Sequence, residues 1–290
     1  MPEIATRIHG VDEFLSQTQA LLEREEAAHQ ILFDLCAHLK KFPEAFLPDS
    51  YFKVVDGDGG VLLAAVMARP HHLVLGGRGG DLNEWIEGVA RDLLEMRWSV
   101  PGVIGPSVMV YKFAGIWANL ACVKFVKGKA LVIYEIKQLQ WPPDVPGKLK
   151  PASMSEVDWI TEWIHQSQKE ALPDREIPSP REIVEARIKA CDVYYWENEK
   201  PVSLVAVMPA GMNGVRISLV YTPPEFRGKG YASICAASVT KMLLDAGCKV
   251  CTAISEADDV MTNRMYERIG FMKVCDVDEY VFEKSERAQT

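Results

Sequence analysis

The chain has 290 residues, of which 48% are apolar and 25% are charged, and these proportions are ordinary for a globular protein. A chain of this length is expected to form about two domains. Its net charge of -8 argues against a nucleic-acid partner, because binding to a phosphate backbone requires a basic face. The same charge permits a cationic substrate.

Targeting and membrane segments are not predicted. Met1–Gly10 has no apolar run after a basic stretch, so we expect no signal peptide. The longest apolar stretches, such as Val61–Met67, have the length of a strand and are far too short to span a membrane. Seven scattered cysteines, an odd number, indicate reduced thiols and a cytoplasmic protein.

The first half of the chain, taken as a domain at 1–140, alternates helical and strand patterns. A helical pattern covers Val11–Lys41. Strands at Tyr51–Val55 and Val61–Met67 then flank a turn whose glycines supply the positive φ of a hairpin. The elements that follow are predicted as strand His72–Leu75, helix Asp81–Met96, strand Val103–Ile104, helix Ser107–Leu120 and strand Ala130–Ile136.

The second half, taken as a domain at 148–290, repeats this order of elements. Its strand Leu204–Met208 is nearly identical to Leu63–Met67, which favours a duplicated domain. The proline-rich segment Gln138–Pro151 is interpreted as the linker. The predicted elements are helices Ser153–Leu172 and Pro180–Ala190, strands Val193–Trp196, Val202–Met208 and Val215–Tyr221, a helix ending near Leu244, strand Lys249–Ile254, helix Val260–Ile269, and strands Phe271–Val277 and Tyr280–Glu283.

The most informative stretch is Val215–Ala232, a strand followed by a loop of arginine and glycines and then a helix. The N-terminus of a helix offers unpaired N–H groups and a partial positive charge, which together bind phosphate. Gly228 and Gly230 lack a Cβ, so a pyrophosphate could approach the backbone closely. Arg227 and Lys229 add two cationic donors. The stretch therefore predicts a phosphate site.

Two segments resemble the signatures of the GNAT N-acetyltransferases. Arg227–Ala232 fits the pattern of Arg or Gln, two residues, Gly, one residue, and Gly or Ala, and it follows the fourth strand of its domain. Asn263–Phe271 is similar to the Asn…Tyr…Gly-Phe segment of that family. The resemblance covers about Lys148–Glu283 and implies an α/β fold, with a mixed central sheet flanked by helices. The repeated order of elements extends this to tandem GNAT-like domains, the first of them degenerate.

The resemblance implies that acetyl-CoA is the cosubstrate, without a metal, and that the acetyl group goes to a primary amine of a small molecule or peptide. The pantetheine arm would pair with a strand that has splayed from its neighbour, as in β-strand addition, and an N–H group of that strand would stabilise the oxyanion. We expect a monomer or homodimer. The implied cosubstrate-binding residues are Val220, Tyr221, Thr222, Arg227, Gly228, Lys229, Gly230, Tyr231, Ala232, Ser233 and Asn263.

Tyr266 is the candidate catalytic residue, because the resemblance implies that a tyrosine here protonates the departing CoA thiolate. It could instead be a core tyrosine, since it shares helical spacing with neighbouring apolar residues. Asp259 stands where the family often has Asn. The general base is left open among Ser218, Tyr221, Glu162 and Glu170.

Other motifs are given structural interpretations. Cys248 and Cys251 have metal or redox spacing but no second pair. The pair His71-His72 has no ligand partner nearby in sequence, and Trp159 and Trp163 could pack in the core or line a substrate cleft.

Gly76–Gly80 occupies the position of a CoA loop in the first half but lacks the signature, and Asp81 would repel a phosphate. We therefore predict that the first half binds no CoA. Two alternatives to catalysis remain, an acyl-CoA sensor without turnover and an interaction module that has lost the cosubstrate.

Overall fold

A computed structural model describes residues 8, 10–42, 46, 49–57, 60–80, 82–171, 181–211 and 213–284. The chain forms two compact units. Unit 1 comprises Met1–Ile133, Ser255–Asp258 and Val274–Thr290, and unit 2 comprises Tyr134–Ile254 and Asp259–Lys273. In the part of the chain that the structure describes, no helix is long and apolar enough to cross a bilayer.

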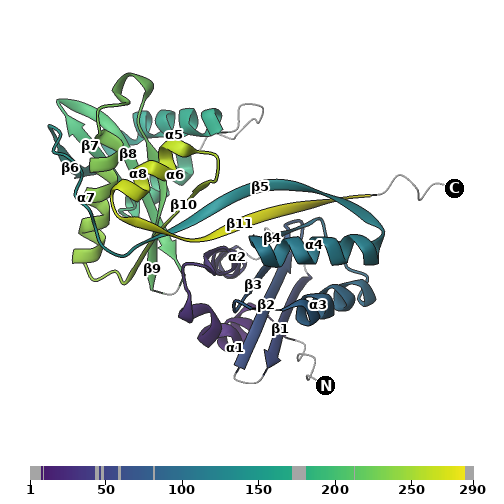
Figure 1. Ribbon diagram of the computed structural model, residues 1–290. Coiled ribbons are helices and arrows are strands. Elements are labelled where there is room, and N and C mark those ends of the chain that lie inside the picture. Colours follow the sequence, from purple (N-terminus) through teal and green to yellow (C-terminus); the bar gives the residue numbers. More distant parts are fainter. Residues whose placement is uncertain are drawn as a thin grey trace. The chain divides into compact units, whose positions relative to one another are not determined.

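Unit 1 is a mixed sheet with helices on both faces (Figure 1). Its strands lie in the order β1-β2-β3-β4-β11-β5, with β3 and β4 parallel and the pairs β1–β2, β2–β3 and β11–β4 antiparallel. The elements are α1 (Val11–Arg24), α2 (Gln30–Lys41), β1 (Ser50–Gly57), β2 (Gly60–Ala68), β3 (Leu73–Gly77), α3 (Asn83–Glu95), β4 (Gly102–Pro106), α4 (Ser107–Ala121), β5 (Val123–Ile136) and β11 (Phe271–Lys284), the last two only in part.

The side chains of β2 alternate between two faces that are both covered by helices, and this explains why its sequence is apolar without interruption. Leu63, Ala65 and Met67 pack against α3 and α4, while Ala64 and Val66 pack against α1 and α2. Successive side chains of a strand point to opposite faces, so a strand covered on both faces is apolar throughout.

Unit 2 is a second mixed sheet with its own helices (Figure 1). Its strands lie in the order β5-β10-β9-β8-β7-β6, with β10 and β9 parallel and the pairs from β9 to β6 antiparallel. Helices α5 and α6 pack on β7 and β8 through an apolar cluster. The elements are β6 (Lys148–Pro151), η2 (Met154–Glu156), α5 (Val157–Ala171), α6 (Arg181–Lys189), β7 (Val193–Asn198), β8 (Lys200–Ala210), β9 (Gly214–Tyr221), η3 (Pro224–Phe226), α7 (Tyr231–Asp245), β10 (Val250–Glu256) and α8 (Val260–Arg268).

The predicted fold class is confirmed, because both units are mixed sheets flanked by helices in the same order of elements. The division into domains 1–140 and 148–290 stays a prediction, and the compact units divide the chain differently. From Val274 onward β11 counts with unit 1, where it pairs with β4, while Tyr134–Ile136 of β5 counts with unit 2. An alternating strand pattern does not specify the sheet that a strand joins.

Several predicted elements differ in detail. The helix predicted at Val11–Lys41 is two helices, interrupted at residues 25–29. The linker Gln138–Pro151 contains strand β6, and the two last predicted strands form one continuous β11. Asp81, the predicted start of a helix, lies outside the described residues.

Candidate functional site

The end of β9 is paired on one side more extensively than on the other. Its antiparallel register with β8 continues to Leu204↔Tyr221, whereas its parallel register with β10 ends at Ala253↔Ile217. Backbone groups of β9 beyond Ile217 therefore lie outside that parallel register. This is the geometry that strand addition by an extended ligand requires.

A β-bulge accompanies this change in pairing. Ala206 pairs with Leu219 and Val207 with Ile217, so Ser218 is the extra residue. Bulges increase local twist and bend the strand that carries them. The sequence gives no signal for this bulge, because Ser218 stands in an otherwise regular apolar strand.

Arg187 of α6 holds the bulge by hydrogen bonds. Its Nη2 donates to Ser218 Oγ and to the Val207 carbonyl, both at 2.7 Å, and Ser218 Oγ donates to the Ala206 carbonyl at 3.0 Å. Burial lowers the pKa of Arg187. Sequence reasoning missed Arg187, since a basic residue in the last turn of a helix is usually a solvated one.

The glycine loop begins after the short helix η3 and ends at α7. Gly228 and Gly230 have φ of 76° and 83°, the left-handed region that favours glycine, and Gly230 is the N-cap of α7. The first backbone hydrogen bond of the helix runs from Ile234 to Gly230 at 3.1 Å. The N–H groups of Tyr231, Ala232 and Ser233 precede it, so the helix itself provides them no acceptor.

The side chains of this loop have specific partners. Lys229 is exposed, and its Nζ donates to the Glu225 carbonyl at 3.2 Å. Tyr231 is buried, and its hydroxyl accepts a hydrogen bond of 2.9 Å from Asn198. Ala232 and Ser233 are half-buried on the first turn of α7.

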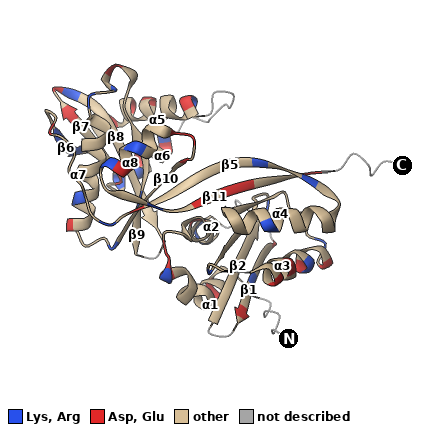
Figure 2. Ribbon diagram, in the orientation of Figure 1, with Lys and Arg blue, Asp and Glu red and all other residues tan. Residues whose placement is uncertain are grey.

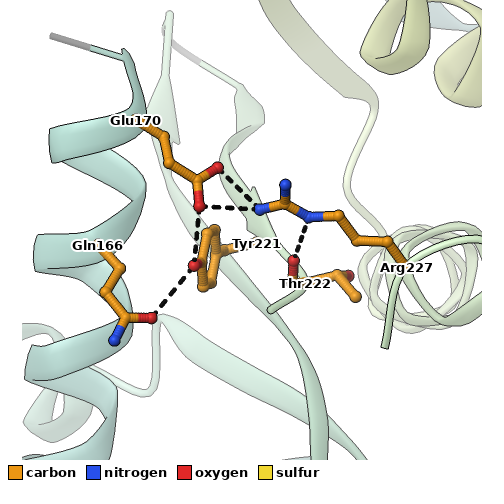
Figure 3. A network of polar contacts seen from close by, with 5 residues as sticks. All are labelled: Gln166, Glu170, Tyr221, Thr222 and Arg227. Atoms are coloured by element: carbon orange, nitrogen blue, oxygen red, sulfur yellow. Dashed lines mark hydrogen bonds and ion pairs between the residues drawn. The ribbon is translucent and has the colours of Figure 1, made fainter. Parts of the chain in front are cut away.

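Arg227 contacts a carboxylate of α5 (Figure 3). Its Nη2 donates to Oε1 and Oε2 of Glu170 at 2.9 and 2.7 Å, and its Nε donates to the Thr222 carbonyl at 2.8 Å. The hydroxyl of Tyr221 lies 3.2 Å from both Gln166 Oε1 and Glu170 Oε1, to either of which it can donate. The structure thus brings the strand end, the glycine loop and α5 together.

The three residues whose backbone is predicted to pair with the cosubstrate lie at the end of β9. Val220 and Tyr221 are its last residues and Thr222 follows them. The Tyr221 carbonyl accepts from Ser203 Oγ at 3.3 Å, and the hydroxyls of Ser203 and Thr222 lie 2.9 Å apart.

Tyr266 is packed as a core residue of α8. Its side chain is 3% exposed, and its ring contacts Tyr134 and Phe271 at centroid distances of 5.9 and 5.3 Å. Burial raises the pKa of Tyr266 above its ordinary value. Both interpretations of this tyrosine therefore remain, although the hydroxyl is firmly protonated at neutral pH.

Asp259 has a local structural role. It is the N-cap of α8, and its carboxylate accepts from the Thr262 N–H at 3.0 Å. An aspartate caps a helix as well as asparagine does. Asn263 is half-buried on the first turn of the same helix.

The four general-base candidates lie in three different places in unit 2. Ser218 is engaged in the bulge. Glu162 is exposed and accepts from Gln166 Nε2 at 2.8 Å. Tyr221 and Glu170 lie together at the end of β9 (Figure 3).

The histidine, cysteine and tryptophan motifs each contact neighbouring protein groups. His72 Nδ1 lies 3.0 Å from Glu279 Oε1 in unit 1. Cys251 is buried, which raises the pKa of its thiol to about 12. Trp159 and Trp163 stack edge to face at 4.8 Å, and Trp163 also contacts Tyr221 at 6.1 Å.

Two glycines at the end of β3 in unit 1 allow close packing. A Cβ on Gly76 would lie 2.9 Å from the His29 ring, and one on Gly77 would lie 2.7 Å from the Leu62 carbonyl. A Cβ on Gly228 would meet no protein atom within 4 Å. A Cβ on Gly79 or Gly80 would likewise meet no protein atom within 4 Å, so open space does not distinguish the two loops.

Charged residues are interspersed over the helices and strands of each unit (Figure 2). Residues 197–281 match the family model described as FR47-like protein. None of the curated proteins compared with the chain matches it.

Solved structures resemble the chain over nearly its whole length. A GNAT-family acetyltransferase from Colwellia psychrerythraea aligns with a TM-score of 0.60 and 11% identity, covering 96% of this chain and 99% of that one. A GCN5-related N-acetyltransferase from Sphaerobacter thermophilus aligns at 0.58 and 14%, covering 98% and 96%. A Drosophila protein aligns at 0.58 and 12%, covering 96% and 98%. The resemblance of this chain to the GNAT acetyltransferases is thereby confirmed at the level of the fold.

Proposed function

We propose that this chain, which has the fold of the GNAT acetyltransferases, is an acetyl-CoA-dependent N-acetyltransferase whose site lies in unit 2. The acceptor would be a primary amine of a small molecule or peptide. The observation that carries the proposal is the end of β9, which extends beyond its register with β10 beside a glycine loop at a helix N-terminus.

The residues of this site fit the parts of acetyl-CoA. The left-handed glycines and the first N–H groups of α7 would bind the pyrophosphate, because they combine donors with the positive end of the helix dipole. The backbone of Val220, Tyr221 and Thr222 would pair with the pantetheine arm. Acetyl-CoA would supply the activated thioester.

Two groups of the chain would assist the transfer. A backbone N–H at the end of β9 would polarise the thioester carbonyl, as an oxyanion hole does. The hydroxyl of Tyr266 would hold the proton that the departing thiolate takes, and its burial keeps that proton in place at neutral pH.

The burial of Tyr266 supports a second candidate, a sensor that binds acyl-CoA without turnover, since a tyrosine that is 3% exposed is equally suited to the core. Calorimetry with acetyl-CoA tests binding, and a thiol-release assay over a panel of primary amines tests turnover. Binding with turnover supports the enzyme, binding without turnover supports the sensor, and the absence of binding excludes both.

A further inference from the structure

We propose that Glu170 exchanges partners during the reaction: it holds Arg227 until acetyl-CoA binds and then receives the ammonium group of the acceptor. The bound ammonium releases a proton to water before its neutral nitrogen attacks the thioester carbonyl. The inference rests on the proposed function, and it assigns to Gln166, Glu170 and Tyr221 the recognition of a primary alkylammonium ion. Figure 3 shows the contacts involved.

Arg227 begins the glycine loop, but its guanidinium points to α5. Its guanidinium donates to both carboxylate oxygens of Glu170, and the two side chains are 47% and 48% exposed. An ion pair that is half exposed is weak, because water screens it and both side chains lose freedom. A diphosphate bound at the loop would offer Arg227 a second anion of higher charge.

When Arg227 turns to the phosphates, the surroundings of Glu170 change. Glu170 then keeps a hydrogen-bonding neighbour in Tyr221 but loses its cation. Burial and the nearby Glu170 carboxylate raise the pKa of Tyr221, so its hydroxyl stays protonated. A carboxylate without a partner favours a nearby positive charge.

A primary ammonium group fits the position beside Glu170. A primary ammonium has three N–H donors, and oxygens of Glu170, Gln166 and Tyr221 gather here as acceptors. Gln166 donates its amide N–H to Glu162 at 2.8 Å, which leaves its carbonyl oxygen toward Tyr221. Trp163, against the Tyr221 ring, adds an aromatic neighbour of the kind that attracts cations.

This arrangement predicts an order of binding. While Arg227 occupies Glu170, the ammonium subsite is already neutralised, so the acceptor binds weakly. Binding of acetyl-CoA removes the guanidinium and creates the subsite. Cosubstrate would therefore strengthen acceptor binding, and by linkage the acceptor would strengthen cosubstrate binding.

The test compares Glu170→Gln with the wild-type chain, since the amide keeps the size and the acceptor oxygen but removes the charge. Asp158→Asn is the matched control, because Asp158 also lies on α5 and pairs instead with Arg181. Calorimetry measures acetyl-CoA affinity, and steady-state thiol release measures KM and kcat for a primary alkylamine.

Two opposite changes are expected in Glu170→Gln. Acetyl-CoA should bind about two- to fivefold more tightly, because Arg227 is freed of a competing carboxylate whose pairing is worth little. The KM for the amine should rise at least about tenfold, with a smaller change in kcat, because a charge-assisted contact is lost. Asp158→Asn should change neither quantity.

If Glu170 had only a structural role, Glu170→Gln would weaken the binding of both acetyl-CoA and the amine and would lower the stability of the chain. Unchanged or weaker acetyl-CoA binding in Glu170→Gln overturns the exchange, and an unchanged amine KM overturns the acceptor role. A wild-type chain that binds no acetyl-CoA contradicts the proposed function itself, so the two failures can be told apart.

Discussion

Arg187 on α6 donates a hydrogen bond of 2.7 Å to Ser218, the extra residue of the β8–β9 bulge. This contact links a helix to the strand position where pairing with β10 ends. Arg187 can therefore position the end of β9 through the bulge that it contacts.

The first prediction is that Arg187→Met lowers the free energy of unfolding by about 2 kcal/mol, because two hydrogen bonds from a half-buried charged group are lost and their acceptors remain. Arg181→Met is the control on the same helix. Arg181 is half exposed and pairs with Asp158 and Glu185, so its loss should cost at most about 1 kcal/mol. Urea denaturation measures both variants. Equal losses of stability in the two variants would show that the contact of Arg187 with the bulge stabilises the chain no more than an exposed ion pair does.

The second prediction concerns the glycine loop. Gly230→Val would be an unclear test, because its Cβ would lie 3.2 Å from Val145, a contact that Gly228 does not have. Gly228→Ala is cleaner, since its Cβ meets no protein atom within 4 Å. It should weaken acetyl-CoA binding at least about tenfold, which corresponds to roughly 1.4 kcal/mol, because the methyl group blocks the approach of the pyrophosphate.

The control for that variant is Gly247→Ala, beyond the opposite end of α7. Gly247 also has a left-handed φ, of 93°, and open space around its Cβ. Both substitutions should cost about 1–2 kcal/mol of stability from backbone strain. Only Gly228→Ala should lose affinity in calorimetry, and equal affinities would place the phosphate elsewhere.

The loop was predictable because its signals are local. Gly228, Gly230 and Arg227 are adjacent in sequence, and the conformation that glycine permits there is a property of the residue itself. The bulge at Ser218 and the partner of Arg227 were not predictable. Both depend on pairing with residues far away in the chain, Ala206 and Glu170, and no residue type identifies such a partner.

The fold was predictable in its elements but not in the assignment of its strands. The pattern of apolar residues located the second half of β5 and divided β11 into two strands, although the strand is continuous from Phe271 to Lys284. The pairing of β11 with β4, which places Val277 opposite Pro106, is set by competition between sheet edges that present similar backbone groups.

The third prediction is that Tyr266→Phe lowers kcat about 10²- to 10⁴-fold while acetyl-CoA affinity stays the same, because only the proton donor is removed. The ring contacts with Tyr134 and Phe271 remain. Tyr134→Phe, which removes the hydroxyl of the neighbouring ring, should leave turnover unchanged. A change in kcat of less than about threefold in Tyr266→Phe would identify it as a core tyrosine.

The fourth prediction is a loss of stability at alkaline pH through Cys251. Burial raises the pKa of its thiol from 9.0 to about 12. Above pH 9 the unfolded chain releases this proton while the folded chain retains it. The free energy of unfolding therefore falls as the pH rises toward 12, by roughly 1 kcal/mol per pH unit.

Cys251→Ala should reduce that slope by roughly 1 kcal/mol per pH unit, as measured by urea denaturation at several pH values, while the buried thiols of Cys36 and Cys235, whose pKa values are also raised, maintain the rest. Cys122, which is exposed, provides the matched control, because Cys122→Ala should leave the slope unchanged. An identical slope in wild type and Cys251→Ala would mean that the thiol ionises without unfolding.

The last prediction is that the intact chain binds one equivalent of acetyl-CoA, in unit 2. In unit 1 Gly76 and Gly77 end strand β3, where a Cβ on either would lie within 3 Å of His29 or Leu62. Gly79 and Gly80 of the loop that follows face open space, but this loop lacks the signature of residues 227–232, and the N-cap of α3 is Leu82 rather than a left-handed glycine. Calorimetry should give a stoichiometry of one, and Gly228→Ala should weaken all of the binding. A second equivalent, or a tight site that survives in Gly228→Ala, would show that unit 1 binds the cosubstrate too.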